Sequence, residues 1–214
     1  MEPRRGLGVS LTRIRLEPRT GDIARTRHDQ EPQAPDGRSF GDPSLAGRAL
    51  TLLPADSKAS GDWPDLYGPL IGSWTVESSF VGPDGATQRA NGQWHFDRIL
   101  GGMGVQDVLF AEGSQPERYG TSLRVVDPRT GLWHVVWMQP GAGEFVALVG
   151  RADGDGIVHQ GHPLDDPEGP LQRWSFTGIS RTSFTWTGES SNDGGVSWSL
   201  EQTMLGTRNE EGSG

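Results

Sequence analysis

From about Leu70 onward, hydrophobic and polar residues alternate in short runs that are separated by turn residues. The run 70–81 places Trp74, Val76 and Phe80 on one face, which is the period-two pattern of a half-buried strand. Pro, Gly, Asn and Asp residues mark the turns between such runs. The pattern predicts strands over residues 70–81, 92–100, 103–111, 118–127, 132–139, 144–151, 157–161, 171–179, 182–189 and 196–207.

No amphipathic helix of ten residues interrupts these runs, which argues against alternating strands and helices with a parallel sheet. We therefore expect an all-β protein, an antiparallel meander closed into an eight- to ten-stranded barrel. Closure is favoured because a barrel leaves no sheet edge exposed. The segment 132–139 is the most apolar and carries apolar residues on both faces.

The composition of the chain changes near residue 62. Residues 1–62 contain one aromatic residue, Phe40, whereas the remaining residues contain the other 16 of the 17 aromatics and all eight Trp. A segment so poor in aromatic residues has little with which to offset the entropy of ordering. We expect a largely disordered extension over 1–61, a barrel over 62–208 and a disordered tail over 209–214. Within the extension, residues 44–53 have helical spacing and predict a short docking segment.

The overall composition argues against several classes of protein. The net charge of −9 disfavours a general nucleic-acid-binding surface. The absence of Cys excludes disulfides and thiolate chemistry. The sequence also contains no stretch of 18 apolar residues, which is the length needed to span a membrane as a helix. Arg4 and Arg5 resemble a twin-arginine pair, but no apolar signal region follows them, so we expect a cytoplasmic protein. We also expect no cofactor and no metal.

Several short motifs resemble a known family. They are Gly72-x-Trp74, the segment 99–102 (Ile-Leu-Gly-Gly), the late strand 184–187 (Phe-Thr-Trp-Thr) and the turn 190–198 that ends in Trp198. Together they resemble uncharacterised bacterial lipocalin-like (calycin) barrel proteins over about residues 63–208. The resemblance implies a lipocalin-like barrel with an internal cavity and no established chemistry, in which Trp74 plugs the closed end and residues 63–69 cap it.

Arg98 is the first candidate for a ligand-binding residue. It shares a strand face with Trp94 and Phe96, and an inward Arg must be paired or must face a wet cavity. Asp107 in the next strand is its candidate partner. The alternative, which we weigh equally, is that Arg98 lies at the barrel rim.

The other candidates are aromatic residues and one histidine. Trp94, Trp133, Trp137 and Trp186 would form pocket walls or fill the core. His134 lies in the most apolar strand, and an imidazole that faces a cavity could act as an acid or base; the alternative is an exterior position.

The pair His159 and His162 has a spacing that also occurs in metal sites. In a strand, residues three apart point to opposite faces, and no further ligand of the right kind is evident. We therefore expect surface histidines near a loop.

These features leave three hypotheses about function. The leading one is binding of a small hydrophobic or aromatic ligand in the barrel, with a homodimer as one option for the oligomeric state. The second is an enzyme on the same barrel, which would catalyse isomerisation, cyclisation or hydration of a small molecule, as in secondary metabolism, and would use Arg98, Asp107 or His134. The third is an interaction domain whose barrel is packed solid. No established catalytic motif is present to decide between them.

Overall fold

The computed structural model describes residues 63–82 and 85–209. The predictions for residues 1–61, including the segment 44–53, and for nearly all of the tail lie outside this range. Ten strands follow a short 3₁₀ turn, η2 (Gly68–Leu70). The strands are β1 (Gly72–Val81), β2 (Thr87–Ile99), β3 (Gly104–Ala111), β4 (Gly120–Val126), β5 (Trp133–Gln139), β6 (Glu144–Asp153), β7 (Gly156–Pro163), β8 (Leu171–Thr177), β9 (Ser183–Ser191) and β10 (Ser199–Arg208).

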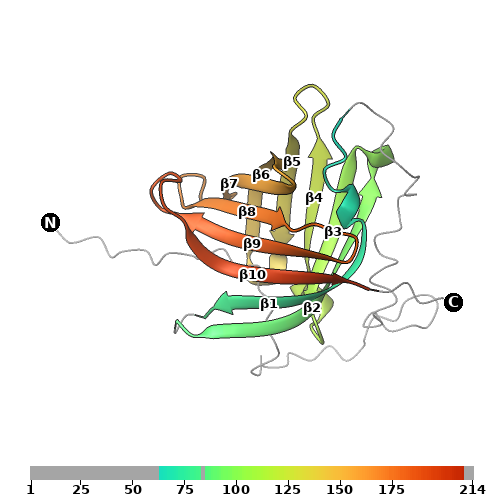
Figure 1. Ribbon diagram of the computed structural model, residues 1–214. Coiled ribbons are helices and arrows are strands. Elements are labelled where there is room, and N and C mark those ends of the chain that lie inside the picture. Colours follow the sequence, from blue (N-terminus) through green and yellow to red (C-terminus); the bar gives the residue numbers. More distant parts are fainter. Residues whose placement is uncertain (1–62, 83–84, 210–214) are drawn as a thin grey trace, which may run out of the picture.

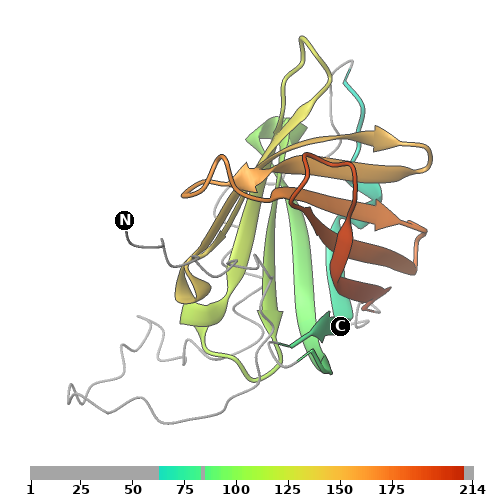
Figure 2. The ribbon, with the colours of Figure 1, turned by 90° about the vertical axis from the view of Figure 1, so that its left-hand side faces the viewer.

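The strands form one closed antiparallel barrel in which every strand pairs with its neighbours in the chain (Figure 1). The barrel closes where β1 pairs with β10, from Trp74 opposite Arg208 to Phe80 opposite Gln202. The expected all-β meander and its closure into a barrel are therefore confirmed, at ten strands. Figure 2 shows the same barrel from the side, with long hairpins that extend beyond its body.

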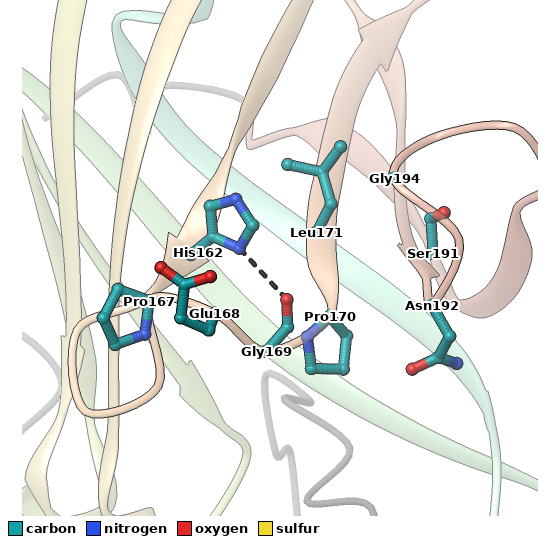
Figure 3. Close-up of a pocket in the computed structure, with 9 residues that line it drawn as sticks. All are labelled: His162, Pro167, Glu168, Gly169, Pro170, Leu171, Ser191, Asn192 and Gly194. Carbon is teal, nitrogen blue, oxygen red and sulfur yellow. Dashed lines mark hydrogen bonds between the residues drawn. The ribbon is translucent and has the colours of Figure 1, made fainter.

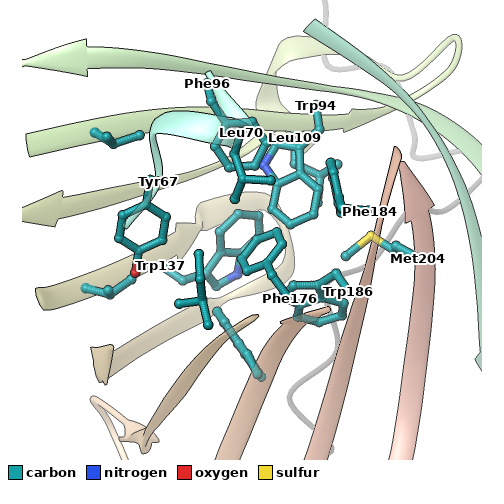
Figure 4. Close-up of a cluster of buried hydrophobic side chains, with 14 of the residues drawn as sticks. Tyr67, Leu70, Trp94, Phe96, Leu109, Trp137, Phe176, Phe184, Trp186 and Met204 are labelled. Atoms are coloured by element: carbon teal, nitrogen blue, oxygen red, sulfur yellow. The ribbon is translucent and has the colours of Figure 1, made fainter. Parts of the chain in front are cut away.

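The alternation in the sequence places the large aromatic side chains inside the barrel. Trp74, Trp133 and Trp137 have no exposed surface, and Phe176 and Phe184 are each 1% exposed. Figure 4 shows how side chains from strands far apart in the sequence meet in this core. Burial of such aromatic area is the main driving force for the fold.

One end of the barrel, which we name the cap end, is covered by η2 and the residues before it. Tyr67 and Leu70 are fully buried there, and the Trp74 indole donates a hydrogen bond to the Leu70 carbonyl at 2.7 Å. Arg208 at the end of β10 donates to the carbonyl of Ile71 at 2.7 Å, and its guanidinium carbon lies 4.0 Å from the centroid of the Trp74 ring. These contacts tie the last strand to the cap. We name the opposite end, where β1 finishes, the mouth end.

None of the helical segments in the described part of the chain has the length and apolar character needed to cross a membrane.

Candidate functional site

The interior of the barrel contains a continuous series of indole rings. The ring centroids of Trp137 and Trp174 are 6.3 Å apart, those of Trp174 and Trp186 are 5.7 Å apart, and those of Trp186 and Trp94 are 6.3 Å apart. Figure 4 shows Trp94, Trp137 and Trp186 projecting toward one another from different strands. Trp133 is buried nearer the cap, where its ring meets Tyr67 edge to face at 4.8 Å.

Two inward-facing glycines make room for these rings. A Cβ atom at Gly120 would overlap the Trp137 indole, and one at Gly188 would lie 2.6 Å from the Trp186 ring. Both glycines stand at positions where the strand alternation would otherwise put a side chain into the interior. The absence of a side chain at Gly120 and at Gly188 therefore leaves space for the indole rings of Trp137 and Trp186.

Several buried polar atoms in this interior have no hydrogen-bond partner within the described part of the chain. They include the indole Nε1 atoms of Trp94, Trp133 and Trp137 and the side-chain Oε1 atoms of Gln172 and Gln202. A buried donor without a partner is destabilising by about 1–3 kcal/mol. Native proteins therefore satisfy such groups or use them.

The two glutamines are held so that their carbonyl oxygens stay unpaired. Gln202 donates from Nε2 to the Ser78 hydroxyl at 2.8 Å, and Gln172 donates to the Pro170 carbonyl at 3.4 Å. Both side chains are at most 2% exposed and lie toward the mouth end. The interior near the mouth therefore combines indole donors and amide acceptors with aromatic walls. We name the side chains of Trp94, Trp137, Gln172 and Gln202 the inner site.

A chain of buried polar side chains lies between the inner site and the cap. Arg124 on β4 forms an ion pair with Asp107 on β3, and the Asp107 carboxylate also accepts a hydrogen bond from the Ser122 amide at 2.9 Å. The Arg124 guanidinium carbon lies 5.2 Å from the centroid of the Tyr67 ring, and the Tyr67 hydroxyl lies 2.7 Å from Nε2 of His159. All four of the residues Asp107, Arg124, Tyr67 and His159 are at most 3% exposed.

The direction of the hydrogen bonds fixes the tautomer of His159. Its Nδ1 lies 2.9 Å from the Trp174 carbonyl, which can only accept, so Nδ1 carries the proton. Nε2 therefore accepts a hydrogen bond from the Tyr67 hydroxyl. Gly150 allows this contact, since a Cβ there would lie 2.8 Å from both the hydroxyl oxygen and the imidazole ring.

Burial keeps both partners of this hydrogen bond neutral. Desolvation, with a further contribution from the Arg124 charge, lowers the pKa of His159 to about 3. Desolvation also raises the pKa of Tyr67 above its ordinary value, although the Arg124 charge opposes the rise. At neutral pH the arrangement is an ion pair next to an uncharged tyrosine–histidine pair.

Arg98 and Asp107 are not partners. Arg98 donates two hydrogen bonds to Asp65, at 2.8 and 2.6 Å, and this pair lies at the cap end, where the Asp65 side chain is 44% exposed. Asp107 is paired with Arg124 instead. Of the two alternatives for Arg98, the rim position is the one found. Asp65 precedes β1 in the sequence, so strand alternation alone could not reveal this pairing.

Of the two alternatives for His134, the exterior position is the one found, because the residue lies on the outer wall of the barrel and is exposed. It alternates with Trp133 and Val135, which are both buried. Because β5 is apolar on both faces, its pattern does not show which face is inward.

Our expectation for His159 was wrong, because this residue is 2% exposed and lies inside the barrel. Arg124 and Tyr67 were not singled out at all. The sequence did indicate an inward position, because His159 lies two residues after Ile157 in the same strand and so shares its face, and Ile157 belongs to the core. Arg124 gave the opposite signal, because both of its neighbours in the sequence, Leu123 and Val125, are apolar.

A hollow of about 500 Å³ lies on the outside near the mouth, between the β7–β8 loop and the β9–β10 turn (Figure 3). His162 on its wall lies 3.2 Å from the Gly169 carbonyl through Nδ1. The Ser191 hydroxyl donates to Asp193 at 2.7 Å. These polar groups hold the two loops, and the cleft is open to solvent.

Within residues 63–82 and 85–209, no three His, Asp or Glu side chains gather in a way that could hold a metal ion.

No protein-family model and no curated protein matches this sequence. Among solved structures, Rv2717c from M. tuberculosis is 17% identical, covers 69% of this chain and 98% of its own, and has a TM-score of 0.48. A redesigned beta barrel, mFAP0, bound to DFHBI, is 19% identical, covers 65% of this chain and 99% of its own, and has a TM-score of 0.36. At such identities and TM-scores these are distant similarities of barrels, and no function is carried over from them.

Proposed function

We propose that this protein binds a small, planar, mostly aromatic molecule in the interior of its barrel, at the inner site. The observation that supports this proposal is the set of unpartnered polar atoms at the inner site, the Nε1 donors of Trp94 and Trp137 and the Oε1 acceptors of Gln172 and Gln202. Ligand sites in proteins are typically apolar concavities with a few polar groups that fix orientation.

The chemistry of the inner site indicates what such a ligand carries. Indole N–H groups donate and cannot accept, so the ligand needs an acceptor such as a carbonyl oxygen. The Arg124 charge is already neutralised by Asp107, and His159 is neutral, so neither of these groups offers a free charge that would attract an ion. A neutral aromatic carbonyl compound fits these requirements better than a carboxylate or an amine.

The enzyme hypothesis has less support from this geometry. Arg98 is paired at the cap end, Asp107 is paired with Arg124, and His134 lies outside. The three residues that were to carry an acid–base step therefore do not converge on one place.

Binding can be tested with two probes of matched shape, 2-acetylnaphthalene and 2-isopropenylnaphthalene, by following the quenching of tryptophan fluorescence of the full chain. Only the ketone offers an acceptor to the indole donors. We expect it to bind at least tenfold more tightly, which corresponds to about 1.4 kcal/mol. Equal affinity of the two probes, or no binding of either, would contradict the proposal.

A pair of tryptophan variants separates recognition from packing. Trp137→Phe removes an unpartnered donor and should abolish most of the preference for the ketone. Trp74→Phe removes a donor that already bonds the Leu70 carbonyl, so it should reduce stability but leave the preference unchanged. Native mass spectrometry of the freshly purified chain would also reveal any ligand that is retained.

A further inference from the structure

The outer wall of β4, β5 and β6 is apolar where a solvated strand face should be polar. Its outward positions form three rows of cross-strand partners. They are Thr121, Met138 and Phe145; Leu123, Val136 and Ala147; and Val125, His134 and Val149. We name these nine residues the apolar outer face. Seven of them are hydrophobic, and none is Asp, Glu, Lys or Arg.

The largest side chains of this face are open to solvent. Leu123 is 38% exposed, Phe145 is 39% exposed and Val149 is 38% exposed. Contiguous exposed apolar surface of this kind on a protein usually marks an interaction site.

The outer wall over β8 and β9 is different. The outward positions of these strands are mostly Ser and Thr, together with an ion pair in which Arg173 donates to Glu189 at 2.7 Å. The apolar outer face is therefore not a property that every part of the outer wall shares.

A groove of about 360 Å³ borders this face on the side of β7. It is lined by residues of β5, β6 and β7 and by Leu164, which is 54% exposed on the loop after β7. The groove extends the apolar surface beyond the three strands, so that it covers four strands and a loop.

We propose that a second copy of this chain packs on the apolar outer face, so that the protein is a homodimer with sheet packed against sheet. The chain has a net charge of −9, so two copies repel each other over most of their surfaces. The apolar outer face has no carboxylate and is where two acidic copies can approach closely. Antiparallel sheets pack face to face at about 10 Å when their facing side chains are apolar.

The size of the surface is at the small end of what a dimer needs. Four strands, β4 to β7, about 4.8 Å apart and about seven residues long, at about 3.3 Å per residue, span roughly 19 by 23 Å, or about 440 Å². Specific interfaces bury about 600–1,000 Å² per partner. The projecting side chains and the β7–β8 loop with Leu164 add to the flat area of the four strands. A two-fold axis through the face would pair the patch with itself, as in most homodimers.

Sedimentation of the full chain tests the proposal. The wild-type protein should show twice the mass of the 23.2 kDa chain at micromolar concentration. Leu123→Glu and Val149→Glu place a carboxylate on the face of both copies and should raise the dissociation constant at least tenfold. The matched control is Leu205→Glu on the outer wall of β10, where Leu205 is 46% exposed; this variant should stay dimeric. Circular dichroism should be the same for all four proteins, which excludes misfolding as the cause.

Two results would overturn the proposal. One is a dimer that the two face variants leave intact, because the contact would then lie elsewhere. The other is a monomeric wild-type chain. If deletion of residues 44–53 from that monomer also reduced the protection of β5 amides from hydrogen exchange, the occupant of the face would be that segment and not a second copy.

Discussion

Arg124 and Asp107 illustrate how much depends on single buried groups. The Asp107 carboxylate is fully buried, and Arg124 is its charged partner. Arg124→Leu would leave that carboxylate uncompensated, and we expect it to lower the free energy of unfolding by about 3–5 kcal/mol. The double variant with Asp107→Leu should recover much of this loss. Urea denaturation of Arg124→Leu, of Asp107→Leu and of the double variant measures both effects, and additive losses in the double variant would contradict this account.

Arg98 provides a comparison at the rim. Its partner Asp65 is 44% exposed, so solvent screens the pair. Arg98→Leu should change the free energy of unfolding by no more than about 1 kcal/mol in the same urea experiment. A loss as large as that of Arg124→Leu would mean that the cap depends on this ion pair.

His159 should make the barrel sensitive to acid. Its pKa is about 3 in the folded protein and about 6.5 when unfolded, so the unfolded chain binds the proton first as the pH falls. The stability contributed by neutral His159 is present above pH 6.5 and is lost progressively toward pH 3, by about 3 kcal/mol at pH 4. The Tyr67 hydroxyl and the Arg124 charge both face the imidazole and do not stabilise a second positive charge, and the hydrogen bond to the Trp174 carbonyl only partly opposes the effect of burial.

The variant His159→Gln isolates this contribution. Carboxylates such as Asp127, whose pKa is lowered to about 2 mainly by hydrogen bonds from Arg129, also make stability fall in acid, but they are common to both proteins. We expect the stability difference between wild type and variant, measured by urea unfolding, to shrink between pH 7 and pH 4. Parallel curves would show that His159 does not control the acid sensitivity.

At the scale of elements, strand alternation predicted the barrel but not every face. Trp74, Trp94 and Trp186 each stand in an apolar phase that has mainly polar residues opposite, and their inward position followed from the sequence. In β4 the apolar phase, Leu123 and Val125, lies outside. The inward phase there contains Gly120, Ser122 and Arg124 before the buried Val126, because a buried ion pair and a tryptophan ring occupy the space. Partners across the barrel, such as Tyr67 and His159, are 92 residues apart in the chain, and no local pattern could join them.

The pairing of a glycine with a tryptophan across β4 and β5 gives a prediction at the same scale. Gly120→Ala would place a methyl group inside the Trp137 ring, so we expect a loss of about 1–3 kcal/mol from overpacking. In a Trp137→Leu background the smaller side chain leaves room, and the same substitution should cost much less. Thermal or urea unfolding of the four proteins forms a double-mutant cycle, and additivity in that cycle would show that the two positions do not compete for space.

At the scale of the whole molecule, the closed barrel does not need a further strand. β1 and β10 pair over seven residues, so no free edge remains for another segment to complete. The cap is also supplied from within the described range, by Tyr67, Leu70 and the contacts of Arg208. Residues 63–209 therefore supply both the pairing of the two edge strands and the cover of the cap end.

From this closure we predict that residues 1–61 are dispensable for folding. These residues hold one of the 17 aromatics, so they offer little area for the core. Limited proteolysis should leave a core that begins near residue 61, and its free energy of unfolding should lie within about 0.5 kcal/mol of that of the full chain. Both proteins must be compared at the same concentration, because a dimer gains stability by mass action. Unfolding of the trimmed protein would mean that part of the core, with residues 44–53 as the first candidate, comes from the N-terminal segment.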